Sequence, residues 1–281
     1  MNKLTRQEFD ALVALTKGSL PSGELAETLI KKGWMADGAI THGGYAALEP
    51  YKARRVIFLA AGFGSRLRPA TLSVPKPLVR VHGRPIICSA IDAAIAAGIE
   101  EIIIVRGYLG EVFDQLLSKY HQVRLVDNPL YTESNNISSA LQVCELMQNA
   151  YVMEADLLIE NPAVFRTYNY TSNCLGVPVE KTADWCVVSQ EGVAKALVKG
   201  GESCHHLFSI YYMTREDGAN LPADLHALFE SEGGKDCFWD MAPMNVFNSH
   251  YHSEVVECSF SDITEIDTYE ELTQVDLDYK L

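Results

Sequence analysis

Along most of the chain, short apolar runs alternate with segments whose apolar residues recur every three or four positions. The apolar runs predict buried strands at residues 56–61, 101–106, 122–127 and 150–153. The segments between them predict helices at 85–97, 110–120 and 137–147. An alternation of this kind is typical of a mostly parallel sheet whose right-handed crossovers carry the helices. We therefore expect an α/β fold with a Rossmann-like sheet.

The pattern changes after residue 173, where short apolar runs follow one another without helices between them. Strands are predicted at 174–179, 185–189, 194–198 and 207–213. Helices near 223–231 and 240–247, a strand near 255–260 and a helix near 268–275 follow. Consecutive short strands are typical of antiparallel pairing. We expect this half to form an antiparallel lid or acceptor region.

The first 52 residues are predicted to be a small helical appendage to a main domain at 53–281. Thr5 and Glu8 fit a capping box that begins one helix, and a second helix is expected at 24–32. A short strand at 39–40, a turn and a short helix follow. This is the outline of a small winged helix, which either binds DNA or serves as a packing or dimerisation appendage. The near-neutral charge and the lack of a basic recognition helix favour the second role.

Charge is spread unevenly along the 281 residues, whose net charge is −14. Residues 1–56 hold eight Lys and Arg against six Asp and Glu, so the acidic excess lies in the remainder. An acidic body disfavours nucleic acid as a partner. No apolar run has the length of a membrane span, and the N-terminus lacks the apolar core of a signal peptide. Seven scattered cysteines without a C-x-x-C pair favour reduced thiols. We expect a cytoplasmic protein with no membrane partner.

A glycine-rich turn at 59–69, L-A-A-G-F-G-S-R-L-R-P, follows the first strand of the main domain. Gly62 and Gly64 let backbone N–H groups approach a ligand closely, because no Cβ stands in the way. Consecutive N–H groups after a strand favour an anion, and Arg66 and Lys76 add positive charge. No G-x4-G-K-[ST] string occurs, and Leu67 replaces the third glycine of a dinucleotide fingerprint. The turn therefore suits the phosphates of a nucleoside triphosphate.

The turn together with the string P-K-P-L at 75–78 resembles the signature of the nucleotidyltransferase superfamily, which activates sugar phosphates and choline phosphate with nucleoside triphosphates. The resemblance covers roughly residues 55–275. It implies an enzyme in which Arg66 and Lys76 are catalytic and neutralise phosphate charge. The nucleotide contacts that it implies, besides these two cations, are Leu59, Ala60, Ala61, Gly62, Gly64, Ser65, Tyr108 and Asn136.

Two aspartates are candidates for a metal site. Asp156 follows a short apolar strand, and Asp267 lies at a strand-to-helix junction. Taken alone, each is as readily a turn residue or a helix cap. The superfamily resemblance implies that they are paired ligands of Mg²⁺, which is commonly held by one or two carboxylates and by phosphate oxygens. Where the superfamily often has D-A-D, this chain has E-A-D, which leaves the role of Glu154 open.

Aromatic residues beside aspartates in the second half are candidates for binding the acceptor. A quaternary ammonium group is held by aromatic faces with carboxylates nearby. The D-W and W-D strings resemble those of bacterial choline-phosphate cytidylyltransferases, some of which have a winged-helix segment before the catalytic domain. This resemblance implies direct in-line transfer of CMP from CTP to phosphocholine, giving CDP-choline and pyrophosphate. The acceptor contacts that it implies are Asp184, Trp185, Tyr212, Trp239 and Asp240.

Other functions stay open at this point. The same reaction could serve a sugar 1-phosphate or an aminoalkyl phosphonate, whose primary amine would depend on carboxylates more than on aromatic faces. A nucleotide-sensing regulator that binds DNA would need the basic recognition helix that the sequence lacks. The choice among CTP, UTP and dTTP, and the formation of a homo-oligomer, are likewise left open.

Overall fold

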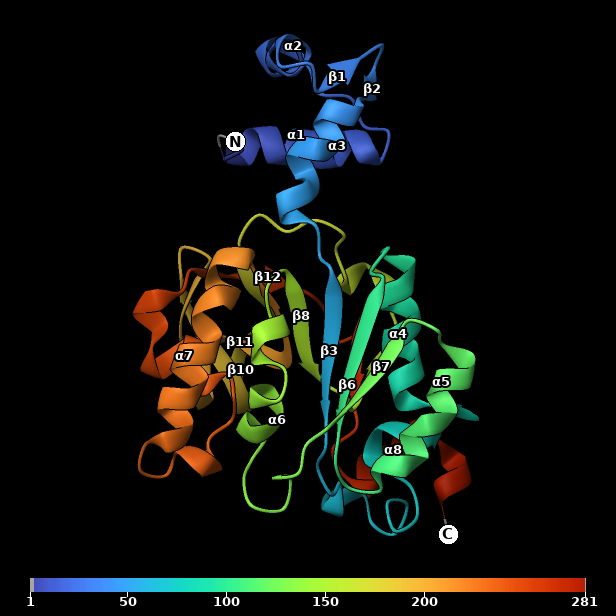
Figure 1. Cartoon of the computed structure of the whole chain (residues 1–281). Coiled ribbons are helices and arrows are strands. Elements are labelled where there is room, and N and C mark those ends of the chain that lie inside the picture. Colours follow the sequence, from blue (N-terminus) through green and yellow to red (C-terminus); the bar gives the residue numbers. More distant parts are fainter. Residues whose placement is uncertain (1–2, 281) are drawn as a thin grey trace. The chain divides into compact units, whose positions relative to one another are not determined.

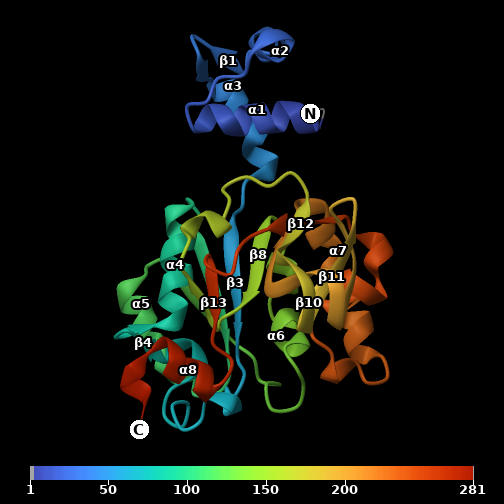
Figure 2. The ribbon, with the colours of Figure 1, turned by 180° about the vertical axis from the view of Figure 1, so that it is seen from behind.

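The computed structural model describes residues 3–280 and divides into two compact units. The first unit combines Met1–Ala53 with the short segment Thr167–Tyr170. The second combines Arg54–Arg166 with Thr171–Leu281. Figures 1 and 2 show both units from opposite sides.

Three short helices and a minimal hairpin make up the first unit. They are α1 (Arg6–Thr16), α2 (Gly23–Lys31), β1 (Met35–Ala36), β2 (Ala39–Ile40) and α3 (His42–Leu48). The predicted capping box begins α1: the Glu8 N–H donates to Thr5 Oγ1, and the Thr5 N–H donates to the Glu8 carboxylate. Leu12, Leu29 and Leu48, one from each helix, are fully buried together. The assignment of this unit as a winged helix stays a prediction.

The segment Thr167–Tyr170 completes the core of the first unit from a distant part of the chain. The Tyr170 ring stacks on the Tyr51 ring, with 5.6 Å between centroids, and packs against Phe9. The Tyr170 hydroxyl donates to the Leu4 carbonyl, and the Leu4 N–H donates to the Tyr51 hydroxyl. Because the contacts of Tyr170 join residues more than a hundred positions apart, no local sequence pattern predicts them.

A seven-stranded sheet organises the second unit, in the order β10-β12-β11-β8-β3-β6-β7. The parallel part consists of β3 (Arg55–Ala60), β6 (Glu101–Arg106), β7 (Val123–Asp127) and β8 (Ala150–Glu154). The remaining strands are β10 (Ser172–Gln190), β11 (Val193–Met213), which runs antiparallel to β8, and β12 (Ser253–Glu257). The expected α/β fold with a mostly parallel core and an antiparallel extension is confirmed.

Helices cover both faces of this sheet (Figures 1 and 2). On one face, α6 (Ile137–Leu141) packs against β3 and α7 (Arg215–Glu230) against β11, in a single apolar core that includes Ile57 and Leu59. On the other lies α4 (Ile86–Ala96), with the small sheet of β9 (Leu157–Ile159) and β13 (Ile263–Glu265). The remaining elements are β4 (Arg80–Val81), β5 (Arg84–Pro85), α5 (Gln115–Lys119) and α8 (Tyr269–Val275). Among the described residues, no helix has the length and apolar character needed to cross a membrane.

Several predicted elements differ in extent from those observed. The four short strands expected between 174 and 213 are two long strands, β10 and β11, which stay paired through their polar middle parts by means of register shifts. The helix expected at 110–120 begins with a 3-10 turn at Gly110–Asp114 before α5. The helix expected at 240–247 is a π-helical turn at Ala242–Val246.

Tyr170→Ala tests the contribution of the inserted segment to the first unit. We expect the variant to lower the stability of this unit by about 2 kcal/mol, less than the ~3–5 kcal/mol typical of a fully buried aromatic residue. Native-state hydrogen exchange should then accelerate in α1 and remain unchanged in β3. Tyr45→Ala, which removes an exposed tyrosine of the same unit, is the control. Equal exchange rates in α1 for the wild type and Tyr170→Ala would contradict the assignment of Tyr170 to the core of the first unit.

Candidate active site

The carboxyl end of the parallel sheet carries the glycine turn. The turn leaves β3 with Gly64 in the left-handed region, at φ +58°. A Cβ on Gly64 would lie 2.8 Å from the Cβ of Lys76, so the glycine lets the two loops pack closely. Thr71 Oγ1 donates to the Gly64 carbonyl, and the Tyr108 hydroxyl donates to the Thr71 carbonyl. Tyr108, predicted as a nucleotide contact, thus braces the turn through its hydroxyl.

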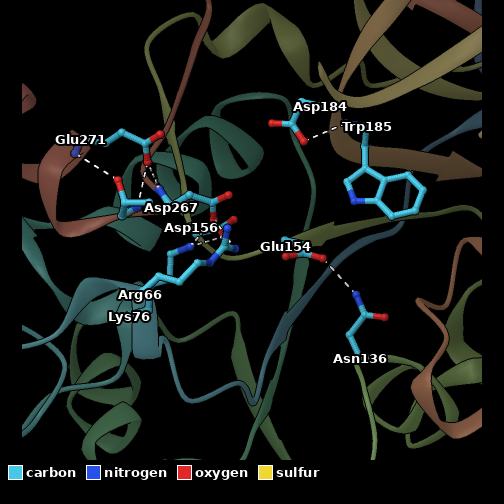
Figure 3. A network of polar contacts seen from close by, with 10 residues as sticks. Arg66, Lys76, Asn136, Glu154, Asp156, Asp184, Trp185, Asp267 and Glu271 are labelled. Atoms are coloured by element: carbon cyan, nitrogen blue, oxygen red, sulfur yellow. Dashed lines mark hydrogen bonds and ion pairs between the residues drawn. The ribbon is translucent and has the colours of Figure 1, made fainter. Parts of the chain in front are cut away.

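A cluster of two cations and two carboxylates lies beside this turn (Figure 3). Lys76 Nζ lies 2.6 Å from Asp156 Oδ2 and 2.8 Å from Asp267 Oδ1. Arg66 Nη2 lies 2.9 Å from the same oxygen of Asp267. The Lys76 side chain is 11% exposed, whereas that of Arg66 is 66% exposed. The structure therefore brings together both predicted catalytic cations and both predicted metal ligands.

The pairing of β13 with β9 positions the carboxylates. Glu265 lies opposite Leu157 in the antiparallel register, which places the segment that contains Asp267 beside Asp156. The N-cap of α8 is Thr268, whose hydroxyl accepts from the Glu271 N–H. Because Thr268 fills the capping role, the Asp267 carboxylate is available to the cluster.

Charge and burial compete within the cluster. Burial acts to raise the pKa of Asp267, but Lys76 and Arg66 outweigh it and lower that pKa. Burial likewise acts to lower the pKa of Lys76, but Asp156 and Asp267 outweigh it and raise that pKa. Glu265 has no comparable cation: burial, together with Asp156 and Asp267, raises its pKa to about 9. Asp267 is thus held as an anion, whereas Glu265 is not.

The same carboxylates fit a hard divalent cation. Ligand oxygens of Asp156, Glu265 and Asp267 all lie within 4.8 Å of one another. Asp156 Oδ1 is buried and has no hydrogen-bond partner among residues 3–280, so it has an unused lone pair. Carboxylate oxygens are the ligands that Mg²⁺ and Ca²⁺ prefer. Glu265 was absent from the predicted ligands, although it stands in the same E-I-D string as Asp267.

A pocket of about 500 Å³ opens next to the cluster. Its wall includes the glycine turn at Ala61 and Gly62, the helix start at Asn136, and Glu154 at the end of β8. Burial, followed by the charges of Asp156 and Asp240, raises the pKa of Glu154 to about 8. Glu154 therefore links the pocket electrostatically to the charged cluster.

Asn136 fixes the floor of the pocket through both ends of its amide. Its Nδ2 donates to Glu154 Oε1 at 2.9 Å, and its Oδ1 accepts from the Trp239 N–H at 2.8 Å. Of the predicted nucleotide contacts, Leu59, Ala61, Gly62 and Asn136 line the pocket. The pocket wall does not include Ala60, Gly64, Ser65 or Tyr108.

Aromatic side chains that the sequence did not single out border the same pocket. Phe63, the variable residue of the G-x-G string, is 41% exposed. Its ring lies 5.3 Å from that of Tyr108 and 5.5 Å from that of Tyr131, centroid to centroid. Phe63, Tyr131 and Phe238 all line the pocket. These three aromatic residues come from distant segments of the sequence, and only the fold brings them to one pocket.

The predicted acceptor residues divide into two groups. Trp185 is partly buried, and its ring meets that of Phe238 edge to face with 5.7 Å between centroids. The backbone N–H of Trp185 donates to Asp184 Oδ1. Asp184 is exposed and Trp185 is partly buried, so a ligand can reach both; Figure 3 shows them in the same view as Glu154. Asp240 is buried and accepts a 2.7 Å hydrogen bond from the Tyr211 hydroxyl, while its Oδ1 has no partner in the described part of the chain.

Two of the predicted acceptor residues, Trp239 and Tyr212, are buried and offer no open surface to a ligand, so the prediction is wrong for them in this respect. Trp239 is 1% exposed and packs edge to face against Tyr211 in the core. Tyr212 is fully buried on the opposite face of β11, where its ring contacts Tyr151. Neighbouring residues of a strand point to opposite faces, so Tyr211 and Tyr212 cannot both face Asp240.

Comparison with known proteins places this geometry in a family. The family model described as nucleotidyl transferase matches residues 55–196. The chain belongs to the nucleotidyl transferase family. It is an enzyme of this class, and the matched residues include the glycine turn, Lys76 and Asp156.

Individual nucleotidyl transferases resemble it over most of its length. A 2-aminoethylphosphonate cytidylyltransferase of Lancefieldella rimae is 32% identical over 79% of this chain and 92% of its own. A choline-phosphate cytidylyltransferase of Streptococcus pneumoniae is 32% identical over 79% of this chain and 97% of its own.

Solved structures of other nucleotidyl transferases have the same fold. The structure of the CTP:phosphocholine cytidylyltransferase from Streptococcus pneumoniae aligns with a TM-score of 0.74 at 29% identity, covering 82% of this chain and all of its own. An inositol-1-phosphate CTP transferase of T. maritima has the same fold at a TM-score of 0.61 and 18% identity, over 80% of this chain and 97% of its own.

Asp240→Asn tests the burial of this carboxylate through the pH dependence of stability. Burial raises the pKa of Asp240 from 3.8 to about 6 in the folded protein, although Tyr211 and backbone N–H groups oppose the rise. Between about pH 4 and pH 6 the folded state keeps a proton that the unfolded state has lost, so this group's contribution to the unfolding free energy falls as the pH rises.

The Asn variant lacks that decline. Relative to the wild type it should gain up to about 3 kcal/mol between pH 4 and pH 7, measured by urea unfolding at each pH. Asp236→Asn, at an exposed neighbouring position, should give a constant difference over this range. A constant difference for Asp240→Asn as well would contradict the raised pKa.

Proposed function

We propose that this nucleotidyl transferase transfers CMP from CTP to phosphocholine and releases pyrophosphate. The observation that carries the proposal is that the cation–carboxylate cluster and the pocket share the glycine turn and the end of β8, where Glu154 lines the pocket and Asp156 belongs to the cluster. Relatives that act on CTP and choline phosphate cover more than two thirds of the chain, which supports both substrates.

The triphosphate would lie along the turn, where Arg66 and Lys76 balance its charge. In phosphoryl transfer, positioning and electrostatic stabilisation supply most of the catalysis. A phosphate oxygen of phosphocholine would attack the α-phosphorus of CTP, and the bond from this phosphorus to the bridging oxygen of pyrophosphate would break. The attacking oxygen is already an anion, so the protein need not supply a strong general base.

We propose Asp156, Glu265 and Asp267 as the residues that hold Mg²⁺. When bound, this ion neutralises charge that develops on the phosphates. The protein's own contribution is to hold Asp267 through the α8 cap and Asp156 through the end of β8, so that both carboxylates meet without rearrangement. The seven free thiols among the described residues support a reducing, cytoplasmic setting for the enzyme.

The acceptor head group would contact Trp185 and Phe238, whose rings meet beside the pocket. An aromatic face attracts a quaternary ammonium group by a cation–π interaction worth about 0.5–2 kcal/mol. Asp184 and the unpartnered Asp240 Oδ1 would add negative charge nearby.

A second candidate acceptor is 2-aminoethylphosphonate, on which one similar relative acts. A primary ammonium group donates three hydrogen bonds. Glu154 lines the pocket and Asp240 follows Phe238 of its wall by two residues, so their carboxyl groups could accept these hydrogen bonds. This candidate therefore predicts a stronger dependence on Glu154 than on Trp185.

A pyrophosphate-release screen tests the proposal. Purified enzyme with Mg²⁺ is combined with each of CTP, UTP, dTTP and ATP, and with phosphocholine, 2-aminoethylphosphonate, phosphoethanolamine or glucose 1-phosphate. We expect release above background with CTP and phosphocholine together, and none with either alone. If kcat/KM is highest for 2-aminoethylphosphonate, the proposed reaction stands but phosphocholine is not the preferred acceptor. Release of pyrophosphate without any acceptor would overturn both the proposed acceptor and the proposed transfer reaction.

Trp185→Ala and Asp267→Asn separate acceptor binding from catalysis. Trp185→Ala should raise KM for phosphocholine about tenfold at nearly constant kcat, because a ground-state contact is lost. Trp185→Phe, which keeps an aromatic face, should recover most of that loss. Asp267→Asn should instead lower kcat by about 100-fold or more, because it removes a contact that matters in the transition state. A change confined to KM for Asp267→Asn would contradict its assigned role.

A further inference from the structure

Lys76 occupies an unusual position for a residue expected to bind phosphate. Its ammonium group donates to Asp156 Oδ2 and to Asp267 Oδ1, so it lies between two of the three carboxylates that fit a divalent cation. The side chain is nearly buried, at 11% exposed, and so are those of its partners Asp156 and Asp267, at 10% and 23%. Solvent therefore screens this interaction weakly.

A divalent cation and the Lys76 ammonium group compete for the same two carboxylates, Asp156 and Asp267. The ligand atoms of the three carboxylates lie within 4.8 Å of one another, which leaves no room for two cations without strong repulsion. With Arg66 and Lys76 in place, the two aspartates already have matching positive charge. A metal ion arriving alone would have to displace a buried ammonium group that has no other carboxylate partner within ion-pair distance among the described residues.

A triphosphate changes this balance because it offers Lys76 a second anionic partner. Once the ammonium group moves toward the phosphates, Asp156 and Asp267 are released. We propose that Lys76 keeps the divalent cation out of the nucleotide-free enzyme, so that metal and nucleoside triphosphate enter together. The proposal rests on the proposed function in one respect, the assignment of Asp156, Glu265 and Asp267 as the metal ligands.

Arg66 provides a matched comparison. Among the described residues its one ion-pair partner is Asp267, and its side chain is 66% exposed. Removing Arg66 takes one positive charge from the same cluster, but it leaves the Lys76 ammonium group between the two carboxylates. If only the net charge of the cluster matters, removing Lys76 or Arg66 should raise the affinity for a divalent cation equally. If the position of Lys76 between the two carboxylates matters, removing Lys76 should raise that affinity more.

The experiment measures Mn²⁺ binding by the electron paramagnetic resonance signal of free Mn²⁺, with and without CTP and with no acceptor present. The proteins are the wild type, Lys76→Met, Arg66→Met and the double variant Lys76→Met/Asp156→Asn. Circular dichroism and thermal unfolding confirm that each variant is folded. Because no product is formed or measured, the result does not depend on which acceptor the enzyme uses.

We expect the wild type to bind Mn²⁺ weakly alone and at least about tenfold more tightly with CTP. Lys76→Met should bind Mn²⁺ without CTP about tenfold more tightly than the wild type, and Arg66→Met within about threefold of it. The double variant should lose the gain, which locates the ion at Asp156. Tight binding by the nucleotide-free wild type, or equal gains in Lys76→Met and Arg66→Met, would overturn the proposal.

Two further outcomes separate this proposal from the proposed function. If no variant binds Mn²⁺ even with CTP, the three carboxylates are not the metal site, and the exclusion of metal by Lys76 is overturned with that assignment. If Mn²⁺ binds as expected but no acceptor yields pyrophosphate, the exclusion of metal by Lys76 stands and the proposed reaction fails.

Discussion

The active site depends on the ion pairs that Lys76 makes with Asp156 and Asp267. Three segments far apart in the sequence carry these residues, and each would be unfavourable to bury as an isolated charge. Together they form a nearly buried cluster in which burial and ion pairing oppose each other, and ion pairing prevails at Lys76 and Asp267. The cluster holds Lys76, which we propose to bind phosphate, and the carboxylates in mutual contact before any substrate arrives.

The sheet topology explains why this cluster forms where it does. The chain moves from β3 outward through β6 and β7 and then returns to the other side of β3 at β8. Ligands of open α/β sheets bind at such a reversal, beyond the carboxyl ends of the strands. The glycine turn leaves β3 and the segment with Glu154 and Asp156 leaves β8, so adjacent parallel strands supply the two sides of the site. The β9–β13 pair then brings Asp267 in from the end of the chain.

Sequence patterns predicted the parts of this arrangement that local physics controls. Strand β6 coincides with its apolar run because a buried parallel strand needs an unbroken apolar sequence. Arg66, Lys76, Asp156 and Asp267 were named from the turn and from a family resemblance, and the structure brings all four together. Their ion pairs were not predicted, because they depend on contacts between distant segments.

Where prediction failed, tertiary packing decided the outcome. Trp239 lies in the W-D string and Tyr212 follows Tyr211, yet both rings are buried in the core. Period-two alternation along β11 already requires Tyr211 and Tyr212 to face opposite sides, which was the available signal. The predicted range of the first unit, residues 1–52, also left out Thr167–Tyr170, a segment from the middle of the other unit's sequence that joins its core.

The most direct test of the account is a ³¹P NMR spectrum of CTP, phosphocholine and Mg²⁺ before and after addition of the enzyme. The account predicts that the resonances of CTP and phosphocholine decline together, while those of a new diphosphodiester and of pyrophosphate grow in equal amounts. Conversion of CTP to CMP and pyrophosphate without loss of phosphocholine would contradict it, as would release of inorganic phosphate from the γ position.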